Sequence, residues 1–160
     1  MTGKIIIITL ILTGFSVAGA QTSAENVAAS VAEHDKANVA MMRNDGETAY
    51  AHLKKAAELD PTNSAFLNSA AYMAMQAEEY DRSIEYLNMA LELDKVKFGE
   101  DHMNVASVLN NIASVYSKMG DKDSAVSHYQ QAYDLVVSSL GEAHPQADII
   151  KRLLDEEKAK

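Results

Sequence analysis

The residues whose types and spacing could do chemistry lie in GEDHMNVASVLNNIASVY, residues 99–116. Glu100, Asp101 and His102 are consecutive there, and carboxylates beside an imidazole can bind a metal ion or transfer protons. The same pattern returns further along the chain as GEAH, residues 141–144. Equivalent positions in packed repeats are separated by about 10 Å, too far for a shared metal site. We therefore interpret both histidines as loop residues that precede a helix.

The rest of the sequence offers little for catalysis. It contains no cysteine, and neither the GxSxG elbow of hydrolases nor the HExxH motif of zinc proteases occurs. His34 lies between Glu33 and Asp35, and we interpret it as a group on a helix surface. We expect no enzyme activity, no catalytic residue, no metal site and no cofactor. An enzyme with a weak hydrolytic site around His34 or His102 is the less favoured alternative.

Sequence repeats organise most of the chain. ETAYAHLKKAAELDPTN, residues 47–63, aligns with DRSIEYLNMALELD, residues 81–94, so that Leu53 matches Leu87. Further along, LDKVKFGEDHMNVA aligns with LVVSSLGEAHPQAD at a somewhat longer spacing. The composition favours helices, with 48% hydrophobic residues, no Trp and two Pro. A unit that repeats at about 34 residues or slightly more is typical of stacked helical hairpins, so the sequence predicts an all-α fold.

This pattern resembles the tetratricopeptide repeat (TPR) family from about Ser30 onward. The second and third repeats resemble the longer kinesin-light-chain type, in which an LG-x-D/E-H-P loop precedes an LNNLA-like helix; FGEDHM, LNNIA and LGEAHP match here. Ser83 departs from the family's Ala at the tight hairpin crossing, and Glu33 stands where a large apolar residue is usual. The resemblance implies a right-handed superhelical stack of about three helix-turn-helix hairpins plus a capping helix. The expected division is a signal peptide at 1–20, a linker or helix extension at 21–29, and a TPR domain at 30–160 with repeats at about 30–63, 64–105 and 106–144 and a capping helix at 145–158.

Turn and capping residues set the expected helix boundaries. Residues 44–46 (NDG) and 120–121 (GD) are typical of hairpin turns. A capping box that begins at Thr22 or at Ser30 starts the first helix, and the two alternatives stay open. We expect helices at about 24–43, 47–59, 63–78, 81–97, 103–118, 122–139 and 145–158.

The N-terminal segment, 1–20, has the features of a secretory signal. Lys4 precedes the apolar run IIIITLILTGFSVAGA, and small residues end this run where a signal peptidase cuts. The run is short for a membrane span of about 20 residues, so cleavage is favoured over a retained anchor. We expect no stable membrane insertion after cleavage. Because disulfides are excluded as well, the sequence favours an exported protein of a bacterium, periplasmic or secreted.

The net charge of the chain limits the kinds of partner that it can bind. Fourteen Lys and Arg against 23 Asp and Glu give a net charge of −9. Such a chain repels the phosphate backbone of DNA and RNA. We therefore expect no nucleic-acid partner.

In the resembling family, the first helix of each hairpin lines a concave groove, and this implies a set of partner-binding residues. The set is rich in amides and hydroxyls, which suit the backbone of an extended peptide. It does not resemble the family's clamp for terminal carboxylates, which needs Lys and Arg where Ser69, Ser107 and Asn111 stand. The candidate groove residues are His34, Asn38, Met41, Asn68, Ser69, Tyr72, Met75, Asn110, Asn111, Ser114 and Lys118.

From these features we expect an exported, non-enzymatic interaction module that binds a partner protein or an extended peptide in a polar groove. The charged last segment, QADIIKRLLDEEKAK, resembles a solvating cap, so we expect a monomer. The alternative is a self-assembling structural or scaffold component of the cell envelope.

Overall fold

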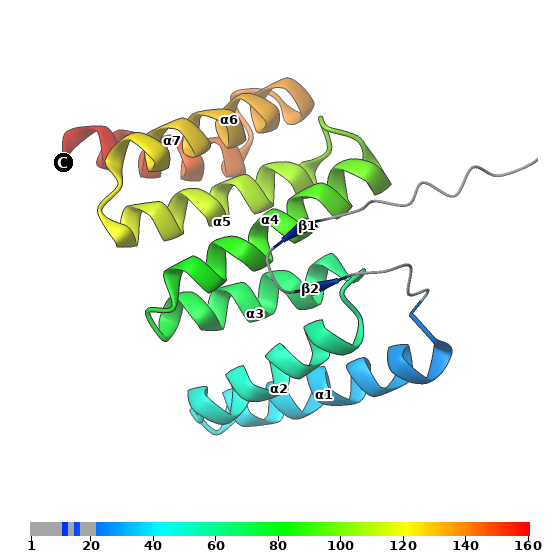
Figure 1. Cartoon of the computed structure of the whole chain (residues 1–160). Coiled ribbons are helices and arrows are strands. Elements are labelled where there is room, and N and C mark those ends of the chain that lie inside the picture. The colour runs from blue at the N-terminus through cyan, green and yellow to red at the C-terminus, as the bar shows by residue number, and fades with distance from the viewer. Residues whose placement is uncertain (1–10, 13–14, 17–21) are drawn as a thin grey trace, which may run out of the picture.

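The computed structural model describes residues 11–12, 15–16 and 22–160. Within these residues, seven α-helices stack as antiparallel hairpins from α1 and α2 at one end to α6 and α7 at the other (Figure 1). The all-α class expected from the repeats is confirmed. The helices are α1 Ala24–Met42, α2 Gly46–Leu59, α3 Ser64–Gln76, α4 Tyr80–Phe98, α5 Met103–Met119, α6 Lys122–Leu140 and α7 Pro145–Ala159.

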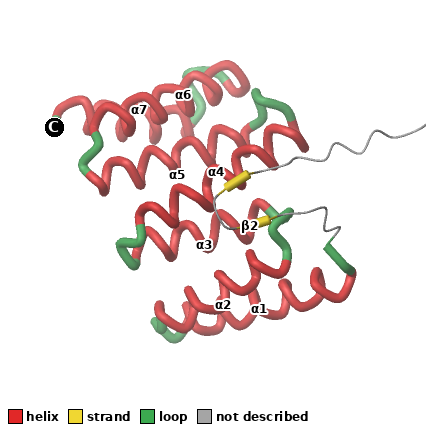
Figure 2. The backbone as a smooth tube through the Cα atoms, in the orientation of Figure 1, coloured by secondary structure: helices red, strands yellow, loops and turns green. Residues whose placement is uncertain are grey.

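The described residues of the N-terminal segment form two short strands. Two strands of two residues each, β1 Ile11–Leu12 and β2 Phe15–Ser16, pair in antiparallel fashion (Figure 2). Most of the expected signal peptide, residues 1–20, lies outside the described residues. No helix of the described part combines the length and the apolar character needed to cross a membrane.

Side-chain caps start six of the seven helices that the structure describes; α4, which follows Glu79, has none. The Asp45 carboxylate accepts a hydrogen bond from the backbone N–H of Thr48 at α2, and other N-terminal caps recur along the chain. At α1 the cap is Ser23, whose hydroxyl accepts from the N–H of Asn26. Both expected starts of a capping box, Thr22 and Ser30, are therefore wrong. Ser30 lies further inside the helix, where its hydroxyl donates to the carbonyl oxygen of Val27.

Each hairpin turns through one residue in the left-handed conformation. Asn44, Glu78 and Gly120 have φ angles of 58°, 61° and 79°. These three residues stand at equivalent positions of successive repeats. The spacing of 34 residues that pairs Leu53 with Leu87 also pairs Asn44 with Glu78, and the longer spacing of 42 residues in the next repeat pairs Glu78 with Gly120. The turns at Asn44 and Gly120 were expected from their residue types, whereas Glu78 gave no such signal.

Alanines at the helix crossings let the paired helices approach closely. Ala71, Ala90, Ala113 and Ala132 are all fully buried, and larger apolar side chains fill the space between them. At the end of the stack, α7 buries an apolar face against α6. Its outer face is exposed and carries Lys151, Arg152, Asp155 and Glu156.

Glu33 is the polar exception in the first hairpin. It is 5% exposed, and its carboxylate lies 2.9 Å from Lys36 Nζ, 2.9 Å from Lys55 Nζ and 2.7 Å from His52 Nδ1. Hydrogen bonds from Lys36, then Lys55 and His52, hold the pKa of this carboxyl at about 2. The position that the family fills with an apolar residue thus joins α1 to α2 through charge.

Candidate peptide-binding groove

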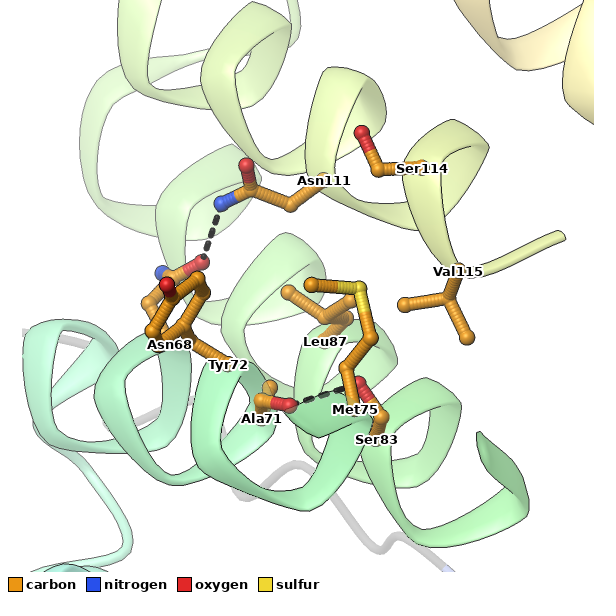
Figure 3. Close-up of a pocket in the computed structure, with 9 residues that line it drawn as sticks. All are labelled: Asn68, Ala71, Tyr72, Met75, Ser83, Leu87, Asn111, Ser114 and Val115. Carbon is orange, nitrogen blue, oxygen red and sulfur yellow. Dashed lines mark hydrogen bonds between the residues drawn. The ribbon is translucent and has the colours of Figure 1, made fainter. Parts of the chain in front are cut away.

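A pocket opens between α3 and α5, with α4 beneath it (Figure 3). Its volume is about 160 Å³. Two layers of side chains form it, an apolar floor and a polar rim. The lining residues are Asn68, Ala71, Tyr72, Met75, Ser83, Leu87, Asn111, Ser114 and Val115.

The floor comes from three helices and is almost entirely apolar. Ala71 of α3, Leu87 of α4 and Val115 of α5 are all buried. Ser83 of α4 is the polar group at this level, and its hydroxyl donates a hydrogen bond to the carbonyl oxygen of Ala71 at 2.7 Å. Because Ser83 satisfies its hydrogen there, the floor offers no free donor and suits an apolar group.

The rim is polar and uncharged. The Nδ2 atom of Asn111 donates to Oδ1 of Asn68 at 3.3 Å, which bridges α5 and α3 across the opening (Figure 3). The Nδ2 atom of Asn68 in turn donates to the carbonyl oxygen of Ser64. Tyr72 is 56% exposed beside this pair. Asn111 is exposed and Asn68 half-buried, and such amides can exchange a long hydrogen bond to each other for bonds to a peptide backbone.

Glu157 links α7 to the end of α5 through a hydrogen bond. Glu157 of α7 is buried, and its carboxylate accepts hydrogen bonds from Ser117 Oγ at 2.6 Å and from Lys160 Nζ at 2.7 Å. Burial, the largest single effect, would raise the pKa of Glu157, but hydrogen bonds from Lys160 and Ser117 outweigh it and lower the pKa. The pocket itself is lined by α3, α4 and α5, in the middle of the stack.

The structure brings together only part of the expected groove set. Asn68, Tyr72, Met75, Asn111 and Ser114 line the pocket. The remaining candidates stand outside its lining: His34, Asn38 and Met41 on α1, Ser69 on α3, and Asn110 and Lys118 on α5.

The residues outside the lining have contacts of their own. Asn38 Nδ2 lies 3.4 Å from His34 Nδ1 on the same helix, and the His34 ring packs 5.0 Å from that of Phe66. Ser69 donates to a carbonyl oxygen of its own helix. The Oδ1 atom of Asn110 is buried and has no hydrogen-bond partner among the described residues. These residues do not shape the pocket.

The floor was not part of the expected groove set. Leu87 was matched as the repeat equivalent of Leu53, and Val115 carried no signal. Ser83 did carry one, because it replaces the Ala that the family prefers at the hairpin crossing. That departure marks the helix crossing beneath the pocket.

His102 and His144 are the N-terminal caps of α5 and α7. His102 Nδ1 accepts from the N–H of Asn104 at 3.1 Å, and His144 Nδ1 accepts from the N–H of Gln146 at 3.2 Å. The interpretation as loop residues before a helix is confirmed. Across the described ranges, no three His, Asp or Glu side chains come together in a way that could hold a metal ion.

Comparison with known proteins shows which repeats and folds this chain is similar to. The sequence profile described as Tetratricopeptide repeat matches residues 61–136. The Hsp70-Hsp90 organizing protein of Triticum aestivum is 30% identical over 136 residues, which are 83% of this chain and 22% of that protein. The chain spans less than a third of the length of the first relatives that it matches.

Two solved structures share the fold. The TPR2B domain of yeast Sti1 in a complex with an Hsp70 peptide superposes with a TM-score of 0.67 at 12% identity, covering 82% of this chain and 98% of that one. The first TPR of Spaghetti (RPAP3) bound to the HSP90 peptide SRMEEVD gives 0.63 at 13% identity, covering 84% of this chain and 96% of that one. At these identities the likeness concerns the fold alone.

Proposed function

The chain belongs to the tetratricopeptide repeat family, and from this premise we propose that it is a non-enzymatic module that holds an extended segment of a partner protein between α3 and α5. The observation that carries the proposal is the pocket of about 160 Å³ with an amide pair across its mouth. Amides supply both donors and acceptors for a peptide backbone. The two structurally similar domains, one solved in a complex with pHsp70 and the other bound to an HSP90 peptide, are consistent with a peptide as the ligand.

The chemistry of the lining supports a binding role over catalysis. Its residues include no carboxylate, imidazole, thiol or amine. General acid-base and nucleophilic mechanisms depend on such groups within hydrogen-bond reach of the substrate. The pocket can therefore orient a ligand without transforming it.

Affinity capture tests this function. Residues 22–160 serve as bait beside the double variant Asn68→Ala/Asn111→Ala, which removes the amide pair. Asn88→Ala, an exposed amide on α4, is the matched control. We expect one set of proteins to be retained by the wild type and by Asn88→Ala and lost by the double variant, with helicity unchanged in circular dichroism. Equal retention by all three baits would contradict the groove.

We further propose that the module is exported. The support is the sequence from Lys4 to Ala20, with its apolar run and small residues before Gln21. Expression of the full chain in a bacterium, followed by fractionation and mass measurement, tests this proposal. We expect a mature protein that begins at Gln21 in the periplasm or the medium. A full-length chain that stays in the cytoplasm would contradict it.

A further inference from the structure

We propose that the pocket selects an internal, extended segment of the partner that inserts one apolar side chain of the size of Leu or Phe, in a neutral to basic surrounding sequence. This inference rests on the proposed function and adds the chemistry of the ligand. It follows from the volume of the pocket, the bonding of its rim and the distribution of charge around it.

The volume fixes the size of the inserted group. An apolar cavity of about 150 Å³ accommodates a benzene ring, and this pocket measures about 160 Å³. Its floor is formed by buried Ala71, Leu87 and Val115. A charged group would lose its hydration there without a compensating partner. One Leu or Phe side chain fits these conditions in both size and polarity.

The amides of the rim determine the path of the bound peptide's backbone. Asn68 and Asn111 lie on neighbouring helices and meet across the opening (Figure 3). A peptide that crosses between them presents its backbone N–H and C=O groups to both amides while one side chain points down to the floor. In an extended chain, successive side chains point to opposite sides, so the residues that flank the anchor point away from the floor.

Charge argues against a free carboxyl terminus in this groove. Capture of a terminal carboxylate is favoured by paired cations, and the pocket lining contains none. Lys118 is the only Lys or Arg among the eleven groove candidates. The chain as a whole has a net charge of −9, which disfavours an acidic peptide and favours a neutral or basic one. SRMEEVD, the ligand of the Spaghetti TPR, has the opposite character.

Ser114 of α5 is a small residue of the pocket lining. Tyr72 stands at the equivalent position of the preceding repeat, in the alignment that pairs Glu78 with Gly120. The Ser114 hydroxyl lies 3.0 Å from the hydroxyl of Tyr129, where either can donate. Introducing the larger residue of the preceding repeat, Ser114→Tyr, places a ring in the space where the anchor side chain would lie.

A peptide library tests the inference. The probes are N-acetylated, C-amidated nonapeptides whose central residue is fixed in turn as Leu, Phe, Ala, Ser or Asp, with all other positions randomised. SRMEEVD with its free carboxylate is measured beside them. Binding is measured by fluorescence polarisation for the wild type, for Ser114→Tyr, and for Ser127→Tyr as the matched control. Ser127 is an exposed serine of α6 outside the pocket.

We expect the Leu pool to bind the wild type and Ser127→Tyr roughly 10- to 50-fold more tightly than the Ala pool, because Leu buries three carbons more than Ala. The Phe pool, with six more carbons than Ala, should bind at least as tightly as the Leu pool. Lys should be enriched over Glu at the flanking positions. With Ser114→Tyr the preference for Leu and Phe should disappear, while helicity stays unchanged.

The other outcomes overturn the inference in distinguishable ways. Tighter binding of SRMEEVD than of the Leu and Phe pools would reject an internal anchor while leaving the groove as a peptide site. An equal Leu preference in Ser114→Tyr would place the anchor elsewhere on the molecule. If no peptide binds, the inference fails, and the capture experiment decides whether the proposed function fails with it.

Discussion

A single buried carboxylate shows how one residue departs from the repeat pattern. Asp94 of α4 is 2% exposed, and its Oδ1 atom has no hydrogen-bond partner among the described residues. Val136 occupies the equivalent buried position in α6. We expect Asp94→Val to raise the free energy of unfolding by about 1 to 3 kcal/mol, because it removes an unsatisfied buried group. Urea denaturation measures the change. The control Asp155→Val, on the exposed face of α7, should shift it by less than about 0.5 kcal/mol, and a loss of stability in Asp94→Val would contradict the argument.

Glu33 makes stability depend on pH. Its carboxyl pKa is lowered from the ordinary 4.5 to about 2 by Lys36, Lys55 and His52. A lowered folded-state pKa stabilises the protein fully above pH 4.5, and this contribution is lost as the pH falls toward 2. We expect Glu33→Gln to cost about 1 to 2 kcal/mol at neutral pH, a modest value because both lysines face water. Denaturant midpoints across this pH range should fall less steeply in Glu33→Gln than in the wild type. Glu58→Gln, at an exposed glutamate of α2, should keep the wild-type slope; an equally steep fall in Glu33→Gln would exclude this role.

At the scale of elements, repeat spacing and helix periodicity predicted the helices because each start and stop is local. The helices expected at 24–43 and 122–139 are found at Ala24–Met42 and Lys122–Leu140. Gly, Asn and Asp at the turns carry this information in their own backbone preferences. The choice of Ser23 as the α1 cap was missed, because Thr22 and Ser30 compete with it near the start of the helix. Local signals of similar strength cannot be ranked by sequence alone.

The turn between α3 and α4 supplies a test at this scale. Glu78 adopts φ = 61°, where the equivalent residue of the next hairpin is Gly120. A left-handed conformation costs a non-glycine residue about 1 to 2 kcal/mol, and Gly loses part of that advantage through its greater freedom when unfolded. We therefore expect Glu78→Gly to stabilise the protein by about 0.5 to 1 kcal/mol. Thermal unfolding monitored by circular dichroism should show a higher midpoint. Glu85→Gly, inside α4, should instead lower it by a similar amount, and a lower midpoint in Glu78→Gly would show that the turn is unstrained.

At the scale of the whole molecule, the site was only partly predictable. The family resemblance indicated which helices face the groove, and five of its eleven candidates line the pocket. The position of the opening depends on how α3, α4 and α5 pack against one another. Ser114 of α5 and Leu87 of α4 both line it. Residues far apart in the sequence set that space. Neither periodicity nor the resemblance carries information about how three helices pack. His34, Asn38 and Met41 were therefore expected in the groove although they lie outside the pocket lining.

The two ends of the stack decide between a discrete module and a growing scaffold. The outer face of α7 carries charged side chains, whereas α1 exposes Val27, Val31, Val39 and Met42. Head-to-tail growth needs the two ends to be complementary, and a charged face does not bury an apolar one favourably. We therefore expect sedimentation of residues 22–160 to give the mass of a monomer, unchanged over about a hundredfold range of concentration. The double variant Val31→Asp/Val39→Asp should sediment identically. A wild-type mass that rises with concentration, and falls back in this variant, would show that the α1 face joins copies of the chain and would favour the scaffold alternative.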